Sequence, residues 1–177
     1  MTVEVTVNGT AEALAADQDL ATALRDAGYT DVKCGCDGGT CGASKVLVDD
    51  EVVMACGTSA EAAAGAEVET VAALGTQDDL HPIQQAFVDH FAVQCGFCIP
   101  GMIVQAKALL AENPDPSEAE VRAALSDNVC RCTGYEKPIA AILDAAGRMR
   151  GEPPAAPAYQ GVGDRGAGDA RGGEASD

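Results

Sequence analysis

The sequence predicts an α+β fold, with strands in the first part of the chain and helices in the second. Residues 3–7 alternate between apolar and polar side chains, the pattern of a half-buried strand. From Leu80 onward the apolar residues recur at the spacing of helix faces instead. The eight cysteines divide equally between the parts, with four before residue 60 and four after residue 90. We therefore expect two adjoining domains, each with its own cysteine site.

Short strands around one helix are predicted for the first part. Asn8-Gly9 is a strong signal for a two-residue hairpin turn. Asp17 or Asp19 can cap a short helix from Leu20 to Ala27, and Gly28 follows its end. The expected strands are residues 3–7, 11–15, 45–48, 52–55 and 68–71.

Four helices are predicted between residues 80 and 150. Their apolar faces are Ile83, Phe87 and Phe91; Ile99, Ile103, Ala106 and Leu110; Val121 and Leu125; and Ile139, Ile142, Leu143 and Ala146. Ser117 and Glu120 give the third helix a capping box. The fourth is expected to begin at Tyr135 or Lys137, with Pro138 in its first turn. All three phenylalanines lie in this part, and we expect them in its core.

Composition excludes several classes of protein. The net charge of −17, with only four lysines, argues against nucleic-acid binding, because phosphates would be repelled. The excess of acidic residues indicates either simply a well-solvated surface or, in the interpretation that we favour, an adaptation to a high-salt cytoplasm. The N-terminus shows no signal-peptide pattern and no apolar run approaches a membrane span. We expect a cytoplasmic protein, whose reducing surroundings keep the thiols available for metal.

After Arg150 the chain becomes rich in Gly, Ala and Pro, with scattered charge. Such a segment cannot bury enough apolar surface to offset the entropy of ordering it. Residues 151–177 are therefore predicted to be a disordered acidic tail.

The second cysteine group has the spacing of a metal site. Cys95 and Cys98 are separated by two residues, a spacer of thirty-one residues follows, and Cys130 and Cys132 are separated by one. Zinc is the first rival to an iron–sulfur cluster, since four thiolates also form structural zinc sites. A Cys-x-Cys pair is tight for two ligands of one tetrahedral ion, whereas a two-iron cluster spreads its ligands over two metals. We favour the cluster.

The longer motifs around these cysteines are QCGFCIPGM at residues 94–102 and NVCRCTGY at residues 128–135. They resemble the helical iron–sulfur domain of the molybdenum hydroxylases, the xanthine oxidase and aldehyde oxidoreductase family. In many members, including the aerobic carbon monoxide dehydrogenases, a separate small subunit holds the clusters. The resemblance covers about residues 1–150. It implies a β-grasp ferredoxin-like domain over residues 1–76 and a four-helix-bundle 2Fe-2S domain over residues 77–150.

The first cysteine group departs from the family pattern. Plant-type ferredoxins read Cys-x4-Cys-x2-Cys with a distant fourth cysteine, and here Cys36, Cys41 and Cys56 fit three of those positions. The remaining position is Ser44, because the chain reads CGAS where the family reads CGAC. Either Cys34 moves in as the fourth ligand, which we favour, or Ser44 binds iron as an alkoxide, or this cluster is absent or degraded.

Electron transfer is the function that these patterns indicate. No nucleophile has a neighbouring base, and His81 and His90 are interpreted as ordinary surface or helix residues. The resemblance implies a large subunit with molybdopterin and a medium subunit with FAD. Electrons would pass from molybdopterin to the second cluster, then to the first, then to the flavin. Gln94 and Cys132 match family residues that lie close to the pterin.

Two alternatives from other classes stay open. The chain could be a free ferredoxin-like carrier, which docks only transiently with its partners. It could also be a zinc-stabilised interaction module, which would be colourless where iron–sulfur clusters are brown.

Overall fold

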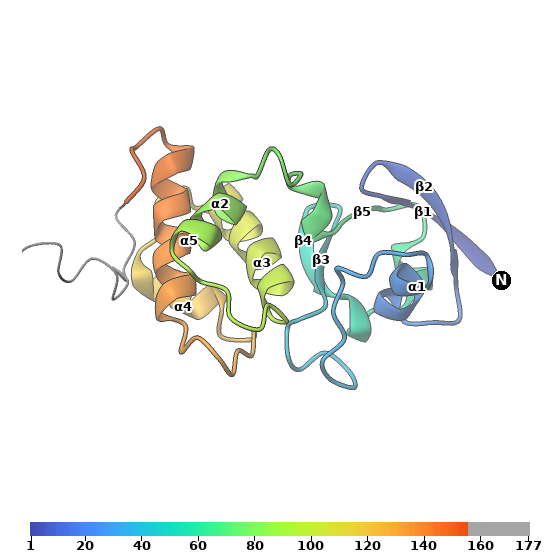
Figure 1. Ribbon diagram of the computed structural model, residues 1–177. Coiled ribbons are helices and arrows are strands. Elements are labelled where there is room, and N and C mark those ends of the chain that lie inside the picture. The colour runs from blue at the N-terminus through green and yellow to red at the C-terminus, as the bar shows by residue number, and fades with distance from the viewer. Residues whose placement is uncertain (156–177) are drawn as a thin grey trace, which may run out of the picture.

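In the computed structural model, which describes residues 1–155, a sheet and a group of helices lie side by side along the molecule (Figure 1). This arrangement confirms the mixed α+β class. Residues 151–155 continue past the last helix, and the Ala155 N–H donates to Asp144 Oδ1 at 2.7 Å. The rest of the predicted disordered tail, residues 156–177, lies outside the described residues.

The sheet has five strands, in the order β2-β1-β5-β3-β4. Their bounds are β1 (Thr2–Val7), β2 (Thr10–Ala15), β3 (Lys45–Val48), β4 (Glu51–Met54) and β5 (Glu67–Glu69). β1 and β5 run parallel, and the other neighbouring pairs run antiparallel. Every strand lies within two residues of its prediction. For the hairpins β1–β2 and β3–β4 this is because the turn residues give a local signal. Asn8 and Gly9, for example, have φ of 50° and 78°, as a primed turn requires.

Helix α1 (Leu20–Asp26) covers one face of this sheet. Asp19 is its N-cap and accepts a hydrogen bond from the Thr22 N–H at 3.0 Å, which confirms one of the two predicted caps. Leu20 and Leu24 are fully buried and pack with strand residues such as Val7, Val46 and Val68. Two short 3-10 helices, Ala55–Gly57 and Ala60–Ala63, lie between β4 and β5, and a third, Val71–Ala73, follows β5.

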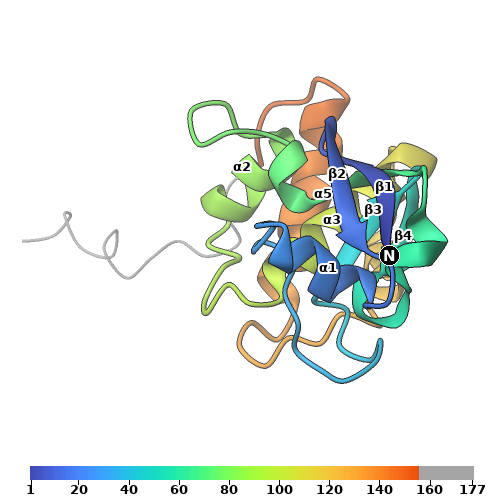
Figure 2. The ribbon, with the colours of Figure 1, turned by 90° about the vertical axis from the view of Figure 1, so that its right-hand side faces the viewer.

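The helical half has its own core. It contains α2 (Pro82–Asp89), α3 (Ile99–Glu112), α4 (Glu118–Ala124) and α5 (Glu136–Met149). Buried at its centre are Ile83, Phe87, Met102, Leu125 and Ile142. Seen from the sheet side, β1, β2 and α1 lie in front, with α3 and α5 behind them (Figure 2).

The predicted first helix of this half is too long. Phe91 lies beyond α2 at a φ of 50° and is 60% exposed, so it is not part of the apolar face. Phe97 is 45% exposed, and only Phe87 of the three phenylalanines is in the core. The chain leaves the helix here because residues 90–98 form the loop that brings Cys95 and Cys98 to the junction of the two halves.

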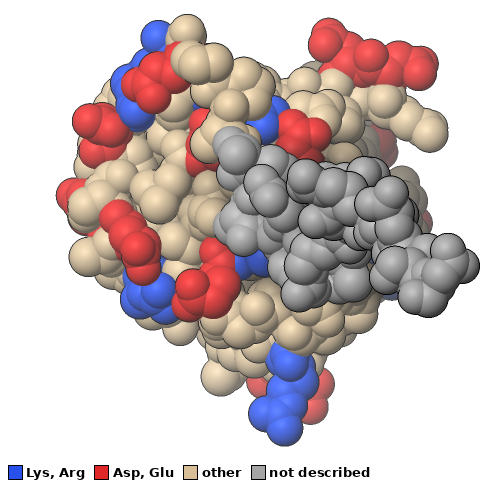
Figure 3. All heavy atoms as spheres, turned by 60° about the vertical axis from the view of Figure 1, so that its left-hand side comes forward, with Lys and Arg blue, Asp and Glu red and all other residues tan. Residues whose placement is uncertain are grey.

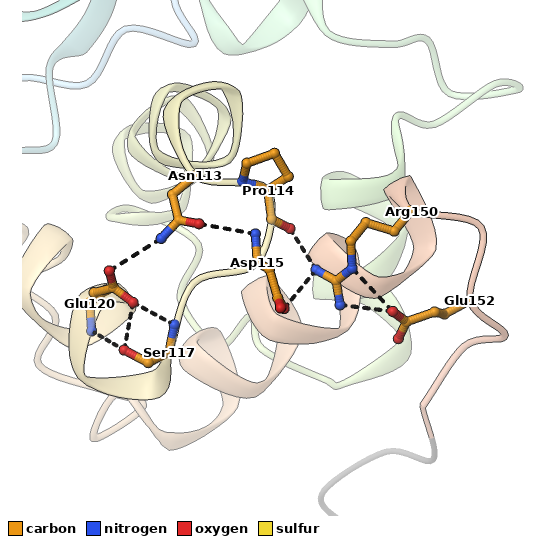
Figure 4. A network of polar contacts seen from close by, with 7 residues as sticks. All are labelled: Asn113, Pro114, Asp115, Ser117, Glu120, Arg150 and Glu152. Carbon is orange, nitrogen blue, oxygen red and sulfur yellow. Dashed lines mark hydrogen bonds and ion pairs between the residues drawn. The ribbon is translucent and has the colours of Figure 1, made fainter.

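The helix ends are fixed by polar contacts (Figure 4). Ser117 and Glu120 form the predicted capping box, with the Glu120 N–H donating to Ser117 Oγ and the Ser117 N–H donating to Glu120 Oε2. Arg150, at the end of α5, bonds the Pro114 carbonyl and pairs with Asp115 and Glu152. The loop before α4 is thereby joined to the end of α5.

The two halves meet where α3 packs against β3 and β4. Lys45, at the start of β3, is buried and donates to Gln105 Oε1 at 2.6 Å and to Asp127. Burial lowers the pKa of this ammonium, and the Asp127 carboxylate opposes that shift. Lys107 of α3 pairs with Glu69 of β5. Charged contacts therefore surround the apolar part of the junction.

The surface is acidic but not divided into patches on the face that Figure 3 shows. Acidic side chains are scattered there, with a few basic ones close to them. None of the helices among residues 1–155 has the length and apolar character needed to cross a membrane.

Candidate metal centres

Both cysteine groups lie in loops where the sheet half and the helical half meet. All eight cysteines are free thiols. The first group comes from the loop between α1 and β3 and from the 3-10 turn after β4. The second comes from the loop before α3 and the loop before α5.

In the first group, Cys36 links the predicted ligands. Its thiol is hydrogen-bonded to the thiols of Cys41 and Cys56. Backbone N–H groups point at the sulfurs: Gly39 donates to Cys56 Sγ at 3.2 Å and Thr40 to Cys36 Sγ at 3.3 Å. Gly39 has a φ of 80°, a conformation that glycine adopts without strain and that lets the loop wrap around the thiols.

Hydrogen bonding makes Cys36 the acidic thiol of this group. N–H groups of Thr40 and Cys41 lower the pKa of Cys36 to about 7, since they stabilise the thiolate. Burial instead raises the pKa of Cys41. The loop therefore supplies at least one thiol that is readily deprotonated, the form in which cysteine binds metal.

The two candidates for the fourth ligand lie in different surroundings. Ser44 is 1% exposed, and its hydroxyl donates to Cys56 Sγ at 3.1 Å. The Cys56 N–H donates in turn to Ser44 Oγ at 3.3 Å. Cys34 is exposed as a residue, although partial desolvation of its thiol raises the pKa of that thiol against the opposing charge of Arg25. Within residues 1–155, no hydrogen bond joins Cys34 to the other three cysteines.

In the second group, the thiols pair across the two motifs. Cys132 Sγ lies 3.5 Å from Cys95 Sγ, and Cys98 is hydrogen-bonded to Cys130. Each pair thus takes one cysteine from each motif. Sequence spacing gave no sign of this pairing, because it reports separation along the chain and not which sulfurs face each other.

Cys98 and Cys130 are held by the surrounding structure. Cys98 is the N-cap of α3, and burial raises its pKa to about 12. The Cys130 N–H donates to the Tyr135 hydroxyl, which donates to the Asn128 carbonyl at 2.7 Å. Thr133 Oγ1 lies 3.0 Å from Cys130 Sγ. Tyr135 itself has a φ of 68°, so the loop turns sharply before α5 begins.

Three other predicted residues lie outside the thiol groups. Gln94 is exposed, next to Cys95. His81 is the N-cap of α2, where its ring accepts from the Ile83 N–H. His90 is 2% exposed with Nε2 2.9 Å from Asp144 Oδ2, so its interpretation as an ordinary surface or helix residue missed a buried hydrogen bond. Residues 89–90 gave no sequence signal for it, because Asp144 is distant in the chain.

One hydrogen bond joins the two groups directly. The Val129 N–H, next to Cys130, donates to the carbonyl oxygen of Cys41 at 2.8 Å. Buried Asn128 donates beside it to the Gly42 carbonyl at 3.0 Å. A Cβ at Gly101 would lie 2.1 Å from that same carbonyl oxygen, so the approach requires glycine. Cys41 was predicted as a ligand, whereas Asn128, Val129 and Gly101 stood out only as members of the two motifs.

A cavity of about 200 Å³ lies between the groups. Its lining includes Cys41 from the first group and all four cysteines of the second, together with Gly35, Ala43, Phe97, Val129 and Arg131. One cysteine of the first group, Cys41, therefore lines the same cavity as the four cysteines of the second group.

The donor sets fit iron–sulfur clusters. Sulfur donors, deprotonation of Cys36 near neutral pH and N–H groups aimed at the sulfurs are what such clusters require. The thiols are arranged in pairs, as two adjacent metals require. Within residues 1–155, no three His, Cys, Asp or Glu side chains converge closely enough to hold a single metal ion.

Comparison with known proteins gives consistent matches. A family model described as a 2Fe-2S binding domain matches residues 70–143. The chain is 42% identical to the nicotinate dehydrogenase small FeS subunit of Eubacterium barkeri, over 84% of this chain and 96% of that protein. It is 45% identical to the aldehyde oxidoreductase of Megalodesulfovibrio gigas, over 85% of this chain and 17% of that longer protein. A chain of quinoline 2-oxidoreductase from Pseudomonas putida 86 matches with a TM-score of 0.80 and 43% identity, covering 86% of this chain and 98% of that one.

Proposed function

We propose that this chain, which belongs to the iron–sulfur subunits of the molybdenum hydroxylases, is an electron relay. It passes electrons from a molybdopterin site to a flavin through two 2Fe-2S clusters. As a subunit of an oxidoreductase complex, the chain transfers electrons, and substrate chemistry takes place on a partner. When bound, each cluster accepts and releases one electron at a time.

Two ligand sets follow for the proposed clusters. Cys36, Cys41 and Cys56 hold the first, with Cys34 or Ser44 as the fourth ligand. The second is held by Cys95, Cys98, Cys130 and Cys132. The proposed domains are a β-grasp ferredoxin-like unit over residues 1–76 and a four-helix bundle over residues 77–150. The separate apolar cores of the two halves support this division.

The observation that most supports a relay is the link between the two groups. The Val129 N–H donates a hydrogen bond to the carbonyl oxygen of Cys41. Cys41 is a proposed ligand of the first cluster, and Val129 directly precedes Cys130, a proposed ligand of the second. Beside it, the Asn128 side chain donates to the Gly42 carbonyl, and the cavity is lined by Cys41 together with all four cysteines of the second group. The chain thus holds its two sites at a fixed separation.

The proposed partners dock at different places. We assign the molybdopterin subunit to the edge at Gln94 and Cys132, both exposed. Exposed apolar side chains lie close by in sequence, at Phe91, Val93 and Phe97, as expected for a surface that a partner covers. A medium FAD-binding subunit would accept electrons from the first site. Eight free thiols support placement in the reducing cytoplasm.

Electron flow in the complex tests this proposal. The chain is to be purified with its neighbouring gene products and reduced by substrate at the molybdenum site. Cys95→Ala or Cys132→Ala should leave molybdenum reducible and block reduction of the flavin. Ser126→Ala is the matched control, since Ser126 is exposed and lies in the loop between α4 and α5 that also contains Cys132. It should leave flavin reduction unchanged.

Three results would contradict the proposal. The first is a chain that purifies alone, at monomer mass, without any molybdenum subunit, which would indicate a free carrier. The second is a colourless product with stoichiometric zinc, which would indicate an interaction module. Flavin reduction that continues in both cysteine variants would contradict the assigned route.

A further inference from the structure

We propose that Ser44 completes the first iron–sulfur site, binding iron through its side-chain oxygen beside Cys56, and that Cys34 is not a ligand. This inference rests on the proposed function, because it requires a two-iron cluster in the first group. It concerns the one position at which the chain departs from the pattern of its family.

The sheet fixes Ser44 next to Cys56. Strands β3 and β4 pair with Lys45 opposite Met54, and the pairing continues one step further. The Ser44 carbonyl accepts a hydrogen bond from the Ala55 N–H at 3.1 Å. The positions of Ser44 and Cys56 therefore follow directly from the register of a hairpin, whereas the other three cysteines lie in the loop between α1 and β3.

The Ser44 side chain points into the group of sulfurs. It is 1% exposed, and both hydrogen bonds of its hydroxyl go to Cys56, one with Sγ and one with the backbone N–H. The Cys56 thiol is in turn hydrogen-bonded to the Cys36 thiol, and Cys36 to Cys41. The four side chains thus form one connected series, with Ser44 and Cys56 at one end and Cys36 and Cys41 at the other. Two adjacent irons need two protein ligands each.

Cys34 is placed differently. The residue is exposed, and the charges that act on its thiol include Arg25 and Asp19, at the two ends of α1, together with the thiols of Cys56 and Cys41. The next residue, Gly35, donates its N–H to Cys41, and a Cβ at Gly35 would lie 2.9 Å from Phe97 Cε1. The space beside Gly35 is therefore already occupied by the Phe97 ring and the Cys41 sulfur, which leaves little room for this part of the loop to move toward the other thiols.

The chemistry of such a ligand is simple to write. One Fe–O bond forms, the Ser44 hydroxyl releases one proton to solvent, and no electron is transferred. An alkoxide is a harder donor than a thiolate, so it favours the ferric state. The first cluster should consequently be harder to reduce than one with four thiolates.

Three variants of the full chain, reconstituted anaerobically with iron and sulfide, test the assignment. Iron content, the paramagnetic signals after dithionite and the midpoint potentials are measured for each. Wild-type chain should bind about four irons and give two distinct signals. Cys34→Ala should leave both signals and the iron content unchanged. Ser44→Ala should lose one signal and fall to about two irons.

Even if the Ser44→Ala variant fails to fold, the Ser44→Cys variant tests whether residue 44 binds iron. It should keep about four irons, change the g values of one signal only and raise the midpoint potential of that cluster, because a thiolate replaces an alkoxide. Loss of a signal in Cys34→Ala, or unchanged g values and potential in Ser44→Cys, would overturn the assignment. So would a folded Ser44→Ala chain that keeps about four irons, since Ser44 would then be only a hydrogen-bond donor. A wild-type chain without any cluster signal would instead overturn the proposed function.

Discussion

Neighbouring backbone groups and burial give the cysteines very different acidities. N–H groups of Thr40 and Cys41 lower the pKa of Cys36 to about 7, whereas burial raises the pKa of Cys98 to about 12. Since only the thiolate binds metal or reacts with electrophiles, the order in which these residues react in the metal-free chain follows from their surroundings.

Alkylation of the metal-free chain tests this order. At pH 7 roughly half of the Cys36 thiol should be ionised, against a fraction on the order of 10⁻⁵ for Cys98. Iodoacetamide in limiting amount should therefore modify Cys36 first and Cys98 last, as read by peptide mass spectrometry. A urea-unfolded sample is the control and should show no such order. Early modification of Cys98 in the folded chain would contradict the structure.

The residues of the site were only partly accessible from sequence. Cys95, Cys98, Cys130 and Cys132 stood out, because short spacings between thiols are local information. The pairing of Cys95 with Cys132 did not, since it depends on how two loops fold toward each other. The hydrogen bond by which Asn128 joins the halves could likewise not be predicted, because its acceptor, the Gly42 carbonyl, is far away in the chain.

Asn128 should contribute to the stability of the junction. Its side chain is fully buried, and it donates to the Gly42 carbonyl beside the link between the sites. Asn128→Ala leaves that buried carbonyl without its donor, so it should lower the free energy of unfolding by about 1–3 kcal/mol. Urea titration of the metal-free chain measures this, with the exposed loop residue Gln77→Ala as control. Equal stability of the two variants would contradict the assigned role.

Elements with local signals were predicted well. The turn at Asn8-Gly9 and the capping box at Ser117 each follow from a few adjacent residues. The end of α2 was not predicted, because helical periodicity continues to Phe91 although the chain turns away there. The helix ends before Phe91, and the loop that follows leads to Cys95 at the junction of the two halves. Apolar periodicity carries no information about this turn.

A buried ion network holds α2 to α5. Asp144 lies 2.9 Å from His90 Nε2 and 2.6 Å from a guanidinium nitrogen of Arg148, and Arg148 also pairs with Asp89. Burial alone would raise the pKa of the Asp144 carboxyl. Hydrogen bonds from Arg148, Ala155 and His90 outweigh it and hold the pKa below its ordinary value.

This network should make stability depend on pH. A carboxyl whose pKa is lowered by folding stabilises the protein above its unfolded pKa, and that contribution is lost as pH falls through the folded pKa. Asp144→Asn should lower the free energy of unfolding by about 3 kcal/mol at pH 7. The difference from wild type should shrink below about pH 4. Denaturant titrations at several pH values measure it, with exposed Asp78→Asn as control. A difference that stays constant down to pH 3 would contradict this account.

At the scale of the molecule, two cores are joined through α3 and the loops that contain the cysteines. The sequence predicted the two halves, because their periodicities differ, but not how they dock. Docking depends on contacts between distant residues, such as Lys45 with Asp127 and Lys107 with Glu69. Acidic side chains are spread over the face in Figure 3, and the interpretation as adaptation to high salt stays a prediction.

That prediction is tested by salt. If repulsion within a net charge of −17 limits stability, added KCl should raise the melting temperature. Most of the rise should come below about 1 M, where the Debye length has shrunk to about 3 Å. A melting temperature that falls or stays constant between about 0.05 M and about 1 M KCl, the range over which screening becomes strong, would contradict the interpretation.

The account depends on two iron–sulfur clusters held by this one chain. Its most direct test is metal analysis and electron paramagnetic resonance of the anaerobically reconstituted full chain after dithionite reduction. We predict about four irons and four acid-labile sulfides per chain, with two distinct paramagnetic signals. A colourless chain with no such signal, or one that binds a single zinc ion, would contradict the account.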